Sequence, residues 1–371
     1  MTEPSGVPVF APDAFLEGCY RQQDQRLAMP LDDPNRWPSW HQELTTALTQ
    51  VLGEVGRPLS GGADGAPREL ERVERPGYVR RRVVLDGGQD YAIPAYVLEP
   101  TGGPAHKAGI VAVHGHGYGS RELVGLGPDG AERSEPTYQK DFGLALVRKG
   151  FVVVCPELLG FGDRRLPEDV ATGDPAQSSC ERIAMNLLLC GRTMAGMRLW
   201  DVTRSIDYLQ SRPDVDGERI GAMGISGGGT VTTLATALDQ RVKAAVISGY
   251  ANTFRDSIMA MHHCVDNYLP GILGLAEMAD ILGLIAPRPL LLEAGTRDPL
   301  FPVAAARRTY TRLRRAYALV GNPGAVRLDV FDGEHQIWGA QAYDFLAEHL
   351  GHVTGGRSVC HTHRRSTAAV V

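Results

Sequence analysis

The stretch RIGAMGISGGGT, Arg219–Thr230, decides the fold. Its apolar run stops at Ile225, and glycines then surround Ser226. Residues Gly224–Gly228 fit the pattern G-x-S-x-G, in which a serine occupies a strained turn between a strand and a helix with its hydroxyl exposed. A Gly-rich chain also produces this pattern by chance, and Ser226 would then only cap the following helix. The flanking segments and the partner residues must therefore decide between the two interpretations.

The flanking segments alternate between strand-like and helix-like patterns from Ala108 onward. Short apolar runs such as AGIVAVHG, FVVVCPE, VKAAVISGY and RPLLLEAG are separated by segments such as LWDVTRSIDYLQSR and TVTTLATALD. Continuous apolar runs suit strands that are buried on both faces. Alternation of such strands with helices predicts an α/β fold with a mostly parallel central sheet and helices on both faces.

The chain has 371 residues, enough for one large domain with additions. We expect residues 1–70 to form an N-terminal helical extension, because Leu44, Leu48 and Leu52 share one helical stripe. Residues 71–350 would form the catalytic domain, with lid-like insertions near 158–197 and 251–285, where connections are longer than a sheet requires. Residues 351–371 are polar and irregular and are expected to form a disordered tail.

The start of the predicted domain has the pattern of a β-hairpin. Residues 91–97 alternate after the turn residues 86–88, and Pro94 predicts that the hairpin lies at a sheet edge. The preceding cluster Arg80–Arg82 is expected to be a solvated face.

Composition excludes several classes of function. The formal net charge is −5 and basic residues are interspersed with acidic ones, so we expect no nucleic-acid partner. No apolar stretch approaches the roughly 20 residues of a membrane helix, and the N-terminus lacks a signal-peptide pattern. The six cysteines are scattered without metal-type spacing, which favours a reducing cytoplasmic location.

A serine hydroxyl needs a base, and the base needs an acid to orient it. His335 stands in DGEHQIWG, after a final strand and before a closing helix, whereas the rivals His262 and His263 lie in the second insertion. Asp298 follows the strand RPLLLEAG. The resulting order Ser226, Asp298, His335 is the chain order of an α/β-hydrolase triad.

The oxyanion of an acyl-transfer intermediate needs two donors. We expect one to be the backbone N–H of Gly227 and the other that of His116, in the loop HGHG after an earlier strand, with Gly117 as the alternative. HGHG could also be an ordinary turn or part of a metal site, but the sequence shows no third ligand. We therefore predict no metal and no cofactor.

Four segments, VHGHGYG, GISGGG, APRPLLLEAGTRDP and DGEHQIWG, together resemble α/β-hydrolases of the acetylxylan-esterase and dienelactone-hydrolase-like group. The resemblance extends over about Tyr78 to Leu350 and also includes PELLGFGDRR. It implies an α/β-hydrolase fold and hydrolysis of a carboxylic ester by Ser226, Asp298 and His335. Dienelactone hydrolases proper use a cysteine nucleophile, so Ser226 favours an esterase.

The predicted function is that of a serine esterase acting on a small-molecule ester. Tyr118, Tyr250, Tyr268 and Trp338 are candidates for the substrate pocket, although each could equally be an ordinary packed aromatic residue. The same triad would also serve a prolyl-oligopeptidase-like peptidase, an acyltransferase or a lyase. A catalytically silent fold that binds a small molecule is the alternative from another class. The N-terminal helices could also bridge two subunits of a homo-oligomer.

Overall fold

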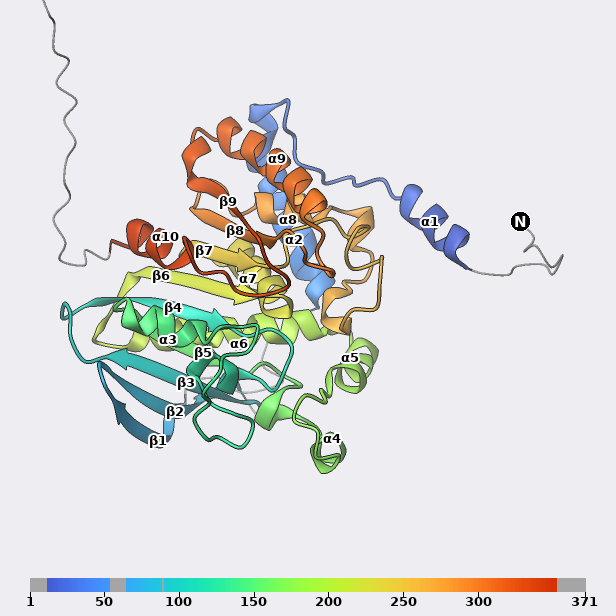
Figure 1. Cartoon of the computed structure of the whole chain (residues 1–371). Helices are drawn as coiled ribbons and strands as arrows, with labels where there is room; N and C mark the ends of the chain where they lie inside the picture. Colours follow the sequence, from blue (N-terminus) through green and yellow to red (C-terminus); the bar gives the residue numbers. More distant parts are fainter. Residues whose placement is uncertain (1–11, 54–64, 89, 352–371) are drawn as a thin grey trace, which may run out of the picture.

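A nine-stranded sheet forms the centre of the computed structural model, which describes residues 12–53, 65–88 and 90–351 (Figure 1). Along the chain the strands are β1 (Arg68–Arg75), β2 (Tyr78–Asp86), β3 (Ala92–Pro100), β4 (Lys107–Val113), β5 (Val152–Pro156), β6 (Val215–Ile225), β7 (Val242–Ser248), β8 (Leu290–Gly295) and β9 (Val326–Phe331). Their order in the sheet is β1-β2-β3-β5-β4-β6-β7-β8-β9. Strands β5, β4 and β6 to β9 are parallel, whereas β1, β2, β3 and β5 pair antiparallel. The predicted α/β fold with a mostly parallel sheet is confirmed.

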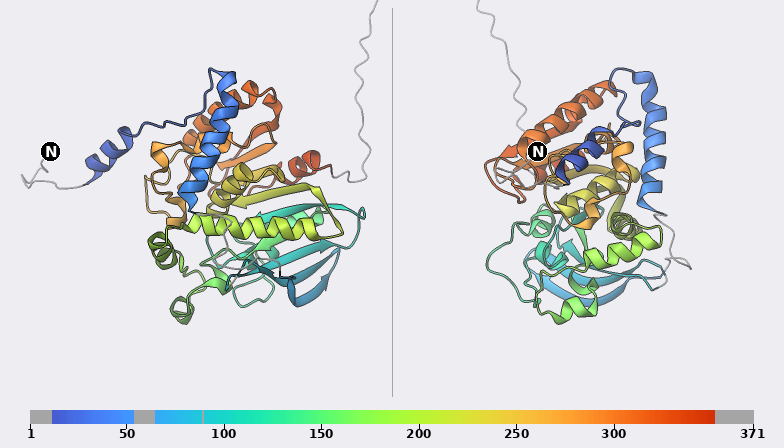
Figure 2. Two further views of the ribbon diagram at one scale, coloured as in Figure 1. Left: turned by 180° about the vertical axis from the view of Figure 1, so that it is seen from behind. Right: turned by 90° about the vertical axis from the view of Figure 1, so that its right-hand side faces the viewer.

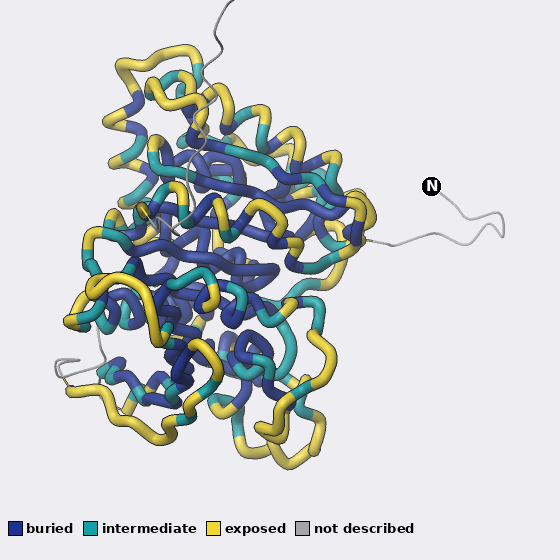
Figure 3. Tube along the Cα trace, turned by 60° about the vertical axis from the view of Figure 1, so that its left-hand side comes forward, coloured by how far each residue is buried: buried dark blue, intermediate teal, exposed yellow. Residues whose placement is uncertain are grey.

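Helices cover both faces of this sheet (Figure 2). One face carries α3 (Phe142–Arg148) and α10 (Ala342–His349), and the other carries α2 (Trp37–Leu52), α6 (Met194–Ser211), α7 (Gly227–Leu238), α8 (Met278–Gly283) and α9 (Val303–Leu319). The apolar strand residues are buried between the two layers, and the exposed segments surround them (Figure 3). Burial on both faces explains why these strands are continuous apolar runs. Within the described ranges, no helix combines the length and hydropathy required to cross a bilayer.

The antiparallel end of the sheet corrects two expectations. Strand β3 lies between β2 and β5, so Pro94 is not at a sheet edge. The carbonyl of Pro94 accepts a hydrogen bond from the N–H of Glu157, just beyond the end of β5. The N–H and C=O of a strand residue point to the same neighbouring strand. The N–H that proline lacks would therefore also point toward the end of β5, and the pairing with β2 loses no hydrogen bond. Arg80 and Arg82 are buried rather than solvated, and Arg82 binds Glu157.

The N-terminal part contains two helices with different environments. Helix α2 buries Trp40, Leu44, Leu48 and Leu52 against the helical layer. Helix α1 (Asp13–Arg21) has no buried residue and lies at the periphery of the protein (Figure 1), where Glu17 forms an ion pair with Arg255 of the second insertion. The predicted extension 1–70 therefore contains one integral and one exposed helix, and its residues 1–11 and 54–64 lie outside the described ranges. Of the predicted tail, only Gly351 is described.

Two long connections leave the carboxyl edge of the sheet. The first follows β5 and contains α4 (Pro167–Ala171) and α5 (Cys180–Leu189). The second follows β7 and contains the short 3-10 helices η4 (Val265–Asn267) and η5 (Ile272–Gly274), followed by α8. Helix α5 packs against η4, so the two insertions are in contact.

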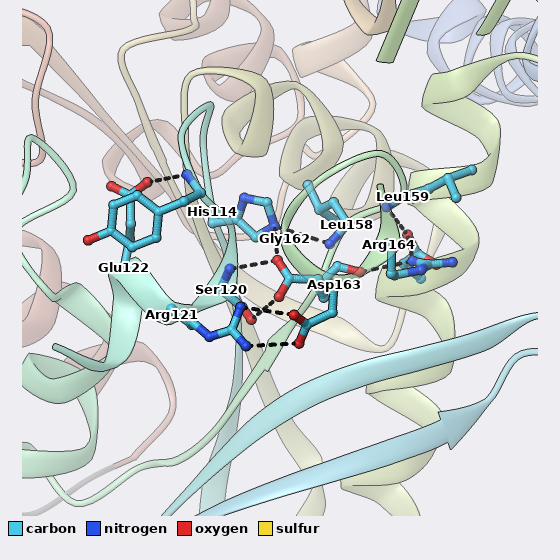
Figure 4. A network of polar contacts seen from close by, with 12 residues as sticks. His114, Ser120, Arg121, Glu122, Leu158, Leu159, Gly162, Asp163 and Arg164 are labelled. Carbon is cyan, nitrogen blue, oxygen red and sulfur yellow. Dashed lines mark hydrogen bonds and ion pairs between the residues drawn. The ribbon is translucent and has the colours of Figure 1, made fainter. Parts of the chain in front are cut away.

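A buried polar network fixes the loops that leave β4 and β5 (Figure 4). The carboxylate of Glu157 accepts hydrogen bonds from the backbone N–H and the hydroxyl of Ser120, at 2.8 and 2.9 Å. The Nε2 atom of His114 accepts from the N–H of Leu158 at 3.1 Å, which leaves Nδ1 to donate to the carbonyl of Gly115 at 2.8 Å. His114 is therefore a neutral structural residue that holds the start of the HGHG loop.

We expect Leu48→Ala to lower the free energy of unfolding by about 2–5 kcal/mol, because truncation of a fully buried leucine leaves a cavity. Gln50→Ala, on the exposed side of the same helix, should change it by less than about 0.5 kcal/mol. Urea denaturation measures both. Equal stability of the two variants would contradict an integral role for α2.

The stability of the fold should fall on acidification because of His114. Burial lowers the pKa of His114 from 6.5 to about 4, so between these values the unfolded chain binds a proton that the folded chain does not. The contribution of His114 to the free energy of unfolding is thus complete above its pKa in the unfolded chain. It is lost as the pH falls toward the pKa of His114 in the folded protein, by about 2 kcal/mol between pH 7 and pH 5. Urea denaturation at both pH values should show this loss for the natural chain and a smaller one for His114→Gln. An identical pH dependence in the two proteins would refute the assignment.

Candidate active site

Ser226 occupies the turn between β6 and α7 in a strained conformation. Its backbone angles are φ 58° and ψ −125°, a region that non-glycine residues rarely occupy. Such strain costs about 1–3 kcal/mol and persists only where the surroundings enforce it. The Ser226 amide donates to the carbonyl of Ser248 at 3.0 Å, which joins the turn to the end of the neighbouring strand β7. This is the strand–turn–helix context that a nucleophile elbow requires.

Glycines permit this turn because there is no room for side chains. A Cβ at Gly224 would overlap the carbonyl of Gly228, and a Cβ at Gly228 would overlap the carbonyl oxygens of Val113 and His114. The strand, the helix and the neighbouring HGHG loop therefore approach one another at backbone distance. This confirms the expected reason for the glycines around Ser226.

Asp298 and His335 are hydrogen-bonded to each other. Asp298 follows β8, and its Oδ2 atom lies 2.8 Å from Nδ1 of His335, in the loop after β9. Its other oxygen, Oδ1, accepts from the N–H groups of Leu300 and Phe301 at 2.8 and 3.0 Å. The carboxylate is thus held by the backbone, and Oδ2 is left to accept the Nδ1 proton of His335.

The His335 ring is enclosed but has one unused nitrogen. It is stacked between Tyr138 and Phe301, each with its ring centroid at 5.7 Å. Gly249 gives the ring space, since a Cβ there would lie 2.9 Å from Cε1 of His335. Among the described residues, no group forms a hydrogen bond with Nε2 of His335. With Nδ1 protonated, Nε2 is the basic nitrogen.

Ser226 and His335 line one cavity of about 330 Å³. Its lining also includes the polar residues His116, Tyr138, His262, His263 and Asn267 and the apolar Leu300. The sequence offered His262 and His263 as alternative bases, and both do reach this cavity. Of these histidines, however, only His335 is hydrogen-bonded to a carboxylate. Burial lowers the pKa of His263, which favours its neutral form.

The HGHG loop runs beside the elbow. A Cβ at Gly115 would lie 3.3 Å from Cβ of Ser226, so the two backbones are nearly in contact. The hydroxyl of Tyr138 donates to the carbonyl of His116 at 2.7 Å and fixes the loop. Among the described residues, neither the N–H of His116 nor that of Gly227 has an acceptor. Tyr138 belongs to no sequence motif and precedes α3 by a few residues, so no local pattern marks it as part of the site.

None of the four predicted pocket aromatics lines this cavity. Tyr118 donates to the carbonyl of Leu126 at 3.1 Å, and Tyr250 is buried behind the site. Trp338 is half exposed and stacks on Phe331, and Tyr268 lines two neighbouring cavities instead. Aromatic character and nearness to a strand end were the only sequence signals for these residues, and neither specifies the direction of a side chain.

A fully buried arginine connects the walls of the site. Arg198, the fifth residue of α6, forms an ion pair with Asp266 of η4. Its guanidinium also donates to the carbonyl of Leu159, at 2.8 and 3.0 Å, and to Sγ of Cys180 at 2.8 Å. It lies over the ring of Phe161, 4.6 Å from the centroid. Arg198 thus joins both insertions to the helical layer.

One cluster in this region has donors suited to a metal. His116, Cys264 and Asp266 each bring one ligand atom within 4.8 Å of the others. The Asp266 carboxylate, however, is already paired with the guanidinium of Arg198, and that positive charge would oppose a bound cation. The donor set therefore fits an ion-pair network better than a metal centre.

Two solved esterase structures are similar to this one in fold. A "putative acetyl xylan esterase" from Bacteroides fragilis NCTC 9343 superposes with a TM-score of 0.74 at 18% identity, over 89% of this chain and 84% of that one. A glucuronoyl esterase from Solibacter usitatus gives a TM-score of 0.62 at 15% identity, over 93% of this chain and 99% of that one.

Sequence comparison shows the family. "Putative hydrolase YtaP" of Bacillus subtilis (strain 168) is 30% identical over 292 residues, 76% of this chain and 89% of that protein. The family model for the dienelactone hydrolase family matches residues 135–321, which include the elbow and Asp298. The chain is a member of the dienelactone hydrolase family, with the α/β-hydrolase fold.

Proposed function

We propose that the protein is a serine esterase that hydrolyses a carboxylic ester through an acyl-enzyme, with Ser226, His335 and Asp298 as its triad. The observation that carries this proposal is the juxtaposition of the strained Ser226 and the carboxylate-bound His335 in one cavity. Both residues have a feature that packing alone does not require. Ser226 has a costly backbone conformation, and His335 has a buried nitrogen, Nε2, without a hydrogen-bond partner among the described residues.

The proton transfers follow from the hydrogen bonds. Nε2 of His335 takes the proton of Ser226 as the serine oxygen attacks the ester carbonyl carbon. Asp298 stabilises the resulting imidazolium through Nδ1 and keeps the ring oriented. The imidazolium then gives its proton to the leaving alcohol. In the second half-reaction a water molecule loses a proton to the same nitrogen and attacks the acyl-enzyme; the bond to the Ser226 oxygen breaks, that oxygen takes the proton back from His335, and the acid is released.

The oxyanion of each tetrahedral intermediate would be stabilised by the N–H groups of Gly227 and His116. Gly227 is the first residue of α7, so its amide also lies at the positive end of a helix dipole. The His116 amide belongs to the loop that Tyr138 fixes through its hydroxyl. Both donors are set before the substrate arrives, which is what makes such stabilisation effective.

The cavity favours a short acyl group on a polar alcohol. Its volume of about 330 Å³ is at the lower end for small-molecule sites, and its lining is rich in histidine and also includes an asparagine. The structurally similar acetyl xylan esterases act, by their names, on an acetyl ester of a carbohydrate. We therefore propose that the substrate is a small ester of a sugar or a comparably polar alcohol.

A fluorophosphonate probe should label Ser226, because an activated serine displaces its fluoride and becomes phosphonylated. Peptide mass mapping identifies the labelled residue, and Ser226→Ala should take up no label. The natural chain should hydrolyse p-nitrophenyl acetate faster than butyrate and octanoate, as measured by kcat/KM. Ester hydrolysis that survives in Ser226→Ala would reject the proposed nucleophile, and a preference for octanoate would reject the short acyl group.

His335→Ala should lower kcat for p-nitrophenyl acetate by about 10³-fold or more, since it removes the base. His262→Ala is a matched control, because His262 lines the same cavity without a carboxylate partner, and it should retain activity within about tenfold. Circular dichroism and thermal unfolding should show that both variants are folded. A larger loss of kcat in His262→Ala than in His335→Ala would move the base to the second insertion.

A further inference from the structure

The two insertions bring two cysteines together beside the catalytic cavity. Cys180 is the first residue of α5, in the first insertion, and Cys264 immediately precedes η4, in the second. Both thiols are free rather than in a disulfide and line one cavity, and the guanidinium of Arg198 contacts both Sγ of Cys180 and the carboxylate of Asp266, two residues after Cys264. The two cysteines are 84 positions apart in the chain, so this arrangement depends on how the insertions fold together.

The surroundings differentiate the two thiols. The guanidinium of Arg198 lies 2.8 Å from Sγ of Cys180 and favours its thiolate. The interaction with Cys264, together with the positive charge of Arg198, lowers the pKa of Cys180 to about 5, and the same interaction raises the pKa of Cys264. The pair therefore offers one thiolate and one neighbouring thiol.

Small molecules can approach this pair. Both cysteines line a cavity of about 550 Å³ next to the catalytic one, and Cys264 lines the catalytic cavity as well. By contrast, Cys155 lines neither of these cavities, and burial raises the pKa of its thiol. Cys190 is exposed at the end of α5, without a described cysteine partner.

We propose that Cys180 and Cys264 form an oxidation site at which a hydroperoxide cross-links the two insertions. The Cys180 thiolate attacks the peroxide oxygen, the O–O bond breaks, and the leaving hydroxide or alkoxide takes up a proton. The sulfur becomes a sulfenic acid. Cys264 then attacks that sulfur, the S–S bond forms, and water leaves with the second thiol proton. In total, two thiols are oxidised to one disulfide. Hydrogen peroxide is reduced to two water molecules, or an organic hydroperoxide to one water and one alcohol.

The cross-link would restrain the wall of the catalytic cavity. Asn267 also lines that cavity and is only three residues from Cys264. A disulfide would hold η4 against α5 covalently, in addition to the Arg198–Asp266 ion pair. This inference concerns the thiols alone and does not depend on the proposed esterase activity.

Peptide mapping of the intact protein tests the proposal. Trypsin places Cys180 in residues 166–182 and Cys264 in residues 256–297, each peptide with one cysteine, and it separates both from Cys190. After treatment with hydrogen peroxide, we expect these two peptides to be linked, with a mass two hydrogens below their sum, and to separate with dithiothreitol. The link should be absent in Cys180→Ser and in Cys264→Ser, and should form normally in the control Cys190→Ser.

Other oxidation products would overturn the proposal. Sulfinic acid on either cysteine without linked peptides, or a link to a different cysteine, would show that the pair does not close. Hydrogen exchange provides a second readout: amides of residues 180–189 and 262–268 should exchange several-fold more slowly in the oxidised protein. A cross-link without slower exchange would overturn the inferred restraint on the cavity wall.

Discussion

The close approach of three backbone segments around Ser226 is the constraint on which the rest of the structure depends. Strand β6, helix α7 and the HGHG loop meet without intervening side chains, because a Cβ at Gly224, Gly228 or Gly115 would overlap a neighbouring segment. The parallel register of β4 and β6, with Val113 opposite Gly224, places the loop beside the turn. The strained conformation of Ser226 and the unpaired amides of Gly227 and His116 are consequences of that packing. The helical layers on both faces of the sheet hold these segments together.

A second constraint lies outside the sheet, in the buried charge of Arg198. A guanidinium removed from water is costly unless its donors are satisfied, and here a carboxylate, a carbonyl and a thiol satisfy them. These acceptors come from different connections. The insertions are thus fixed in place by electrostatics as well as by apolar packing, and the residue after Asp266, Asn267, accepts a hydrogen bond from Thr230 of α7 at 2.8 Å.

Local sequence patterns predicted the fold and the candidate triad because the strands and the serine turn follow local rules of sequence. Apolar runs predicted the parallel strands, and the G-x-S-x-G turn with two partners in chain order selected Ser226, Asp298 and His335 as candidates, of which Ser226 and His335 line one cavity and Asp298 is hydrogen-bonded to His335. Side-chain direction follows no such rule, which is why Tyr118, Tyr250, Tyr268 and Trp338 were chosen and Tyr138 was not. The contacts of Arg198 were also unpredictable, since they join segments that are distant in the chain and have no motif. The prediction from Pro94 was wrong for a related reason. A proline removes one backbone donor at its own position, and this does not prevent the rest of the strand from pairing on both sides.

The buried pair of Arg198 and Asp266 also bears on how such a protein can diversify. The candidate catalytic residues lie on loops that leave the sheet separately, so the cavity walls could in principle change without altering the chemistry. The insertion that contains Asp266, however, forms a buried ion pair with Arg198 of helix α6. An exchange of that insertion alone with a relative would leave a cation buried without its counter-ion, at a cost of about 3–5 kcal/mol. The two halves of the cavity wall are therefore inherited most easily as a single unit.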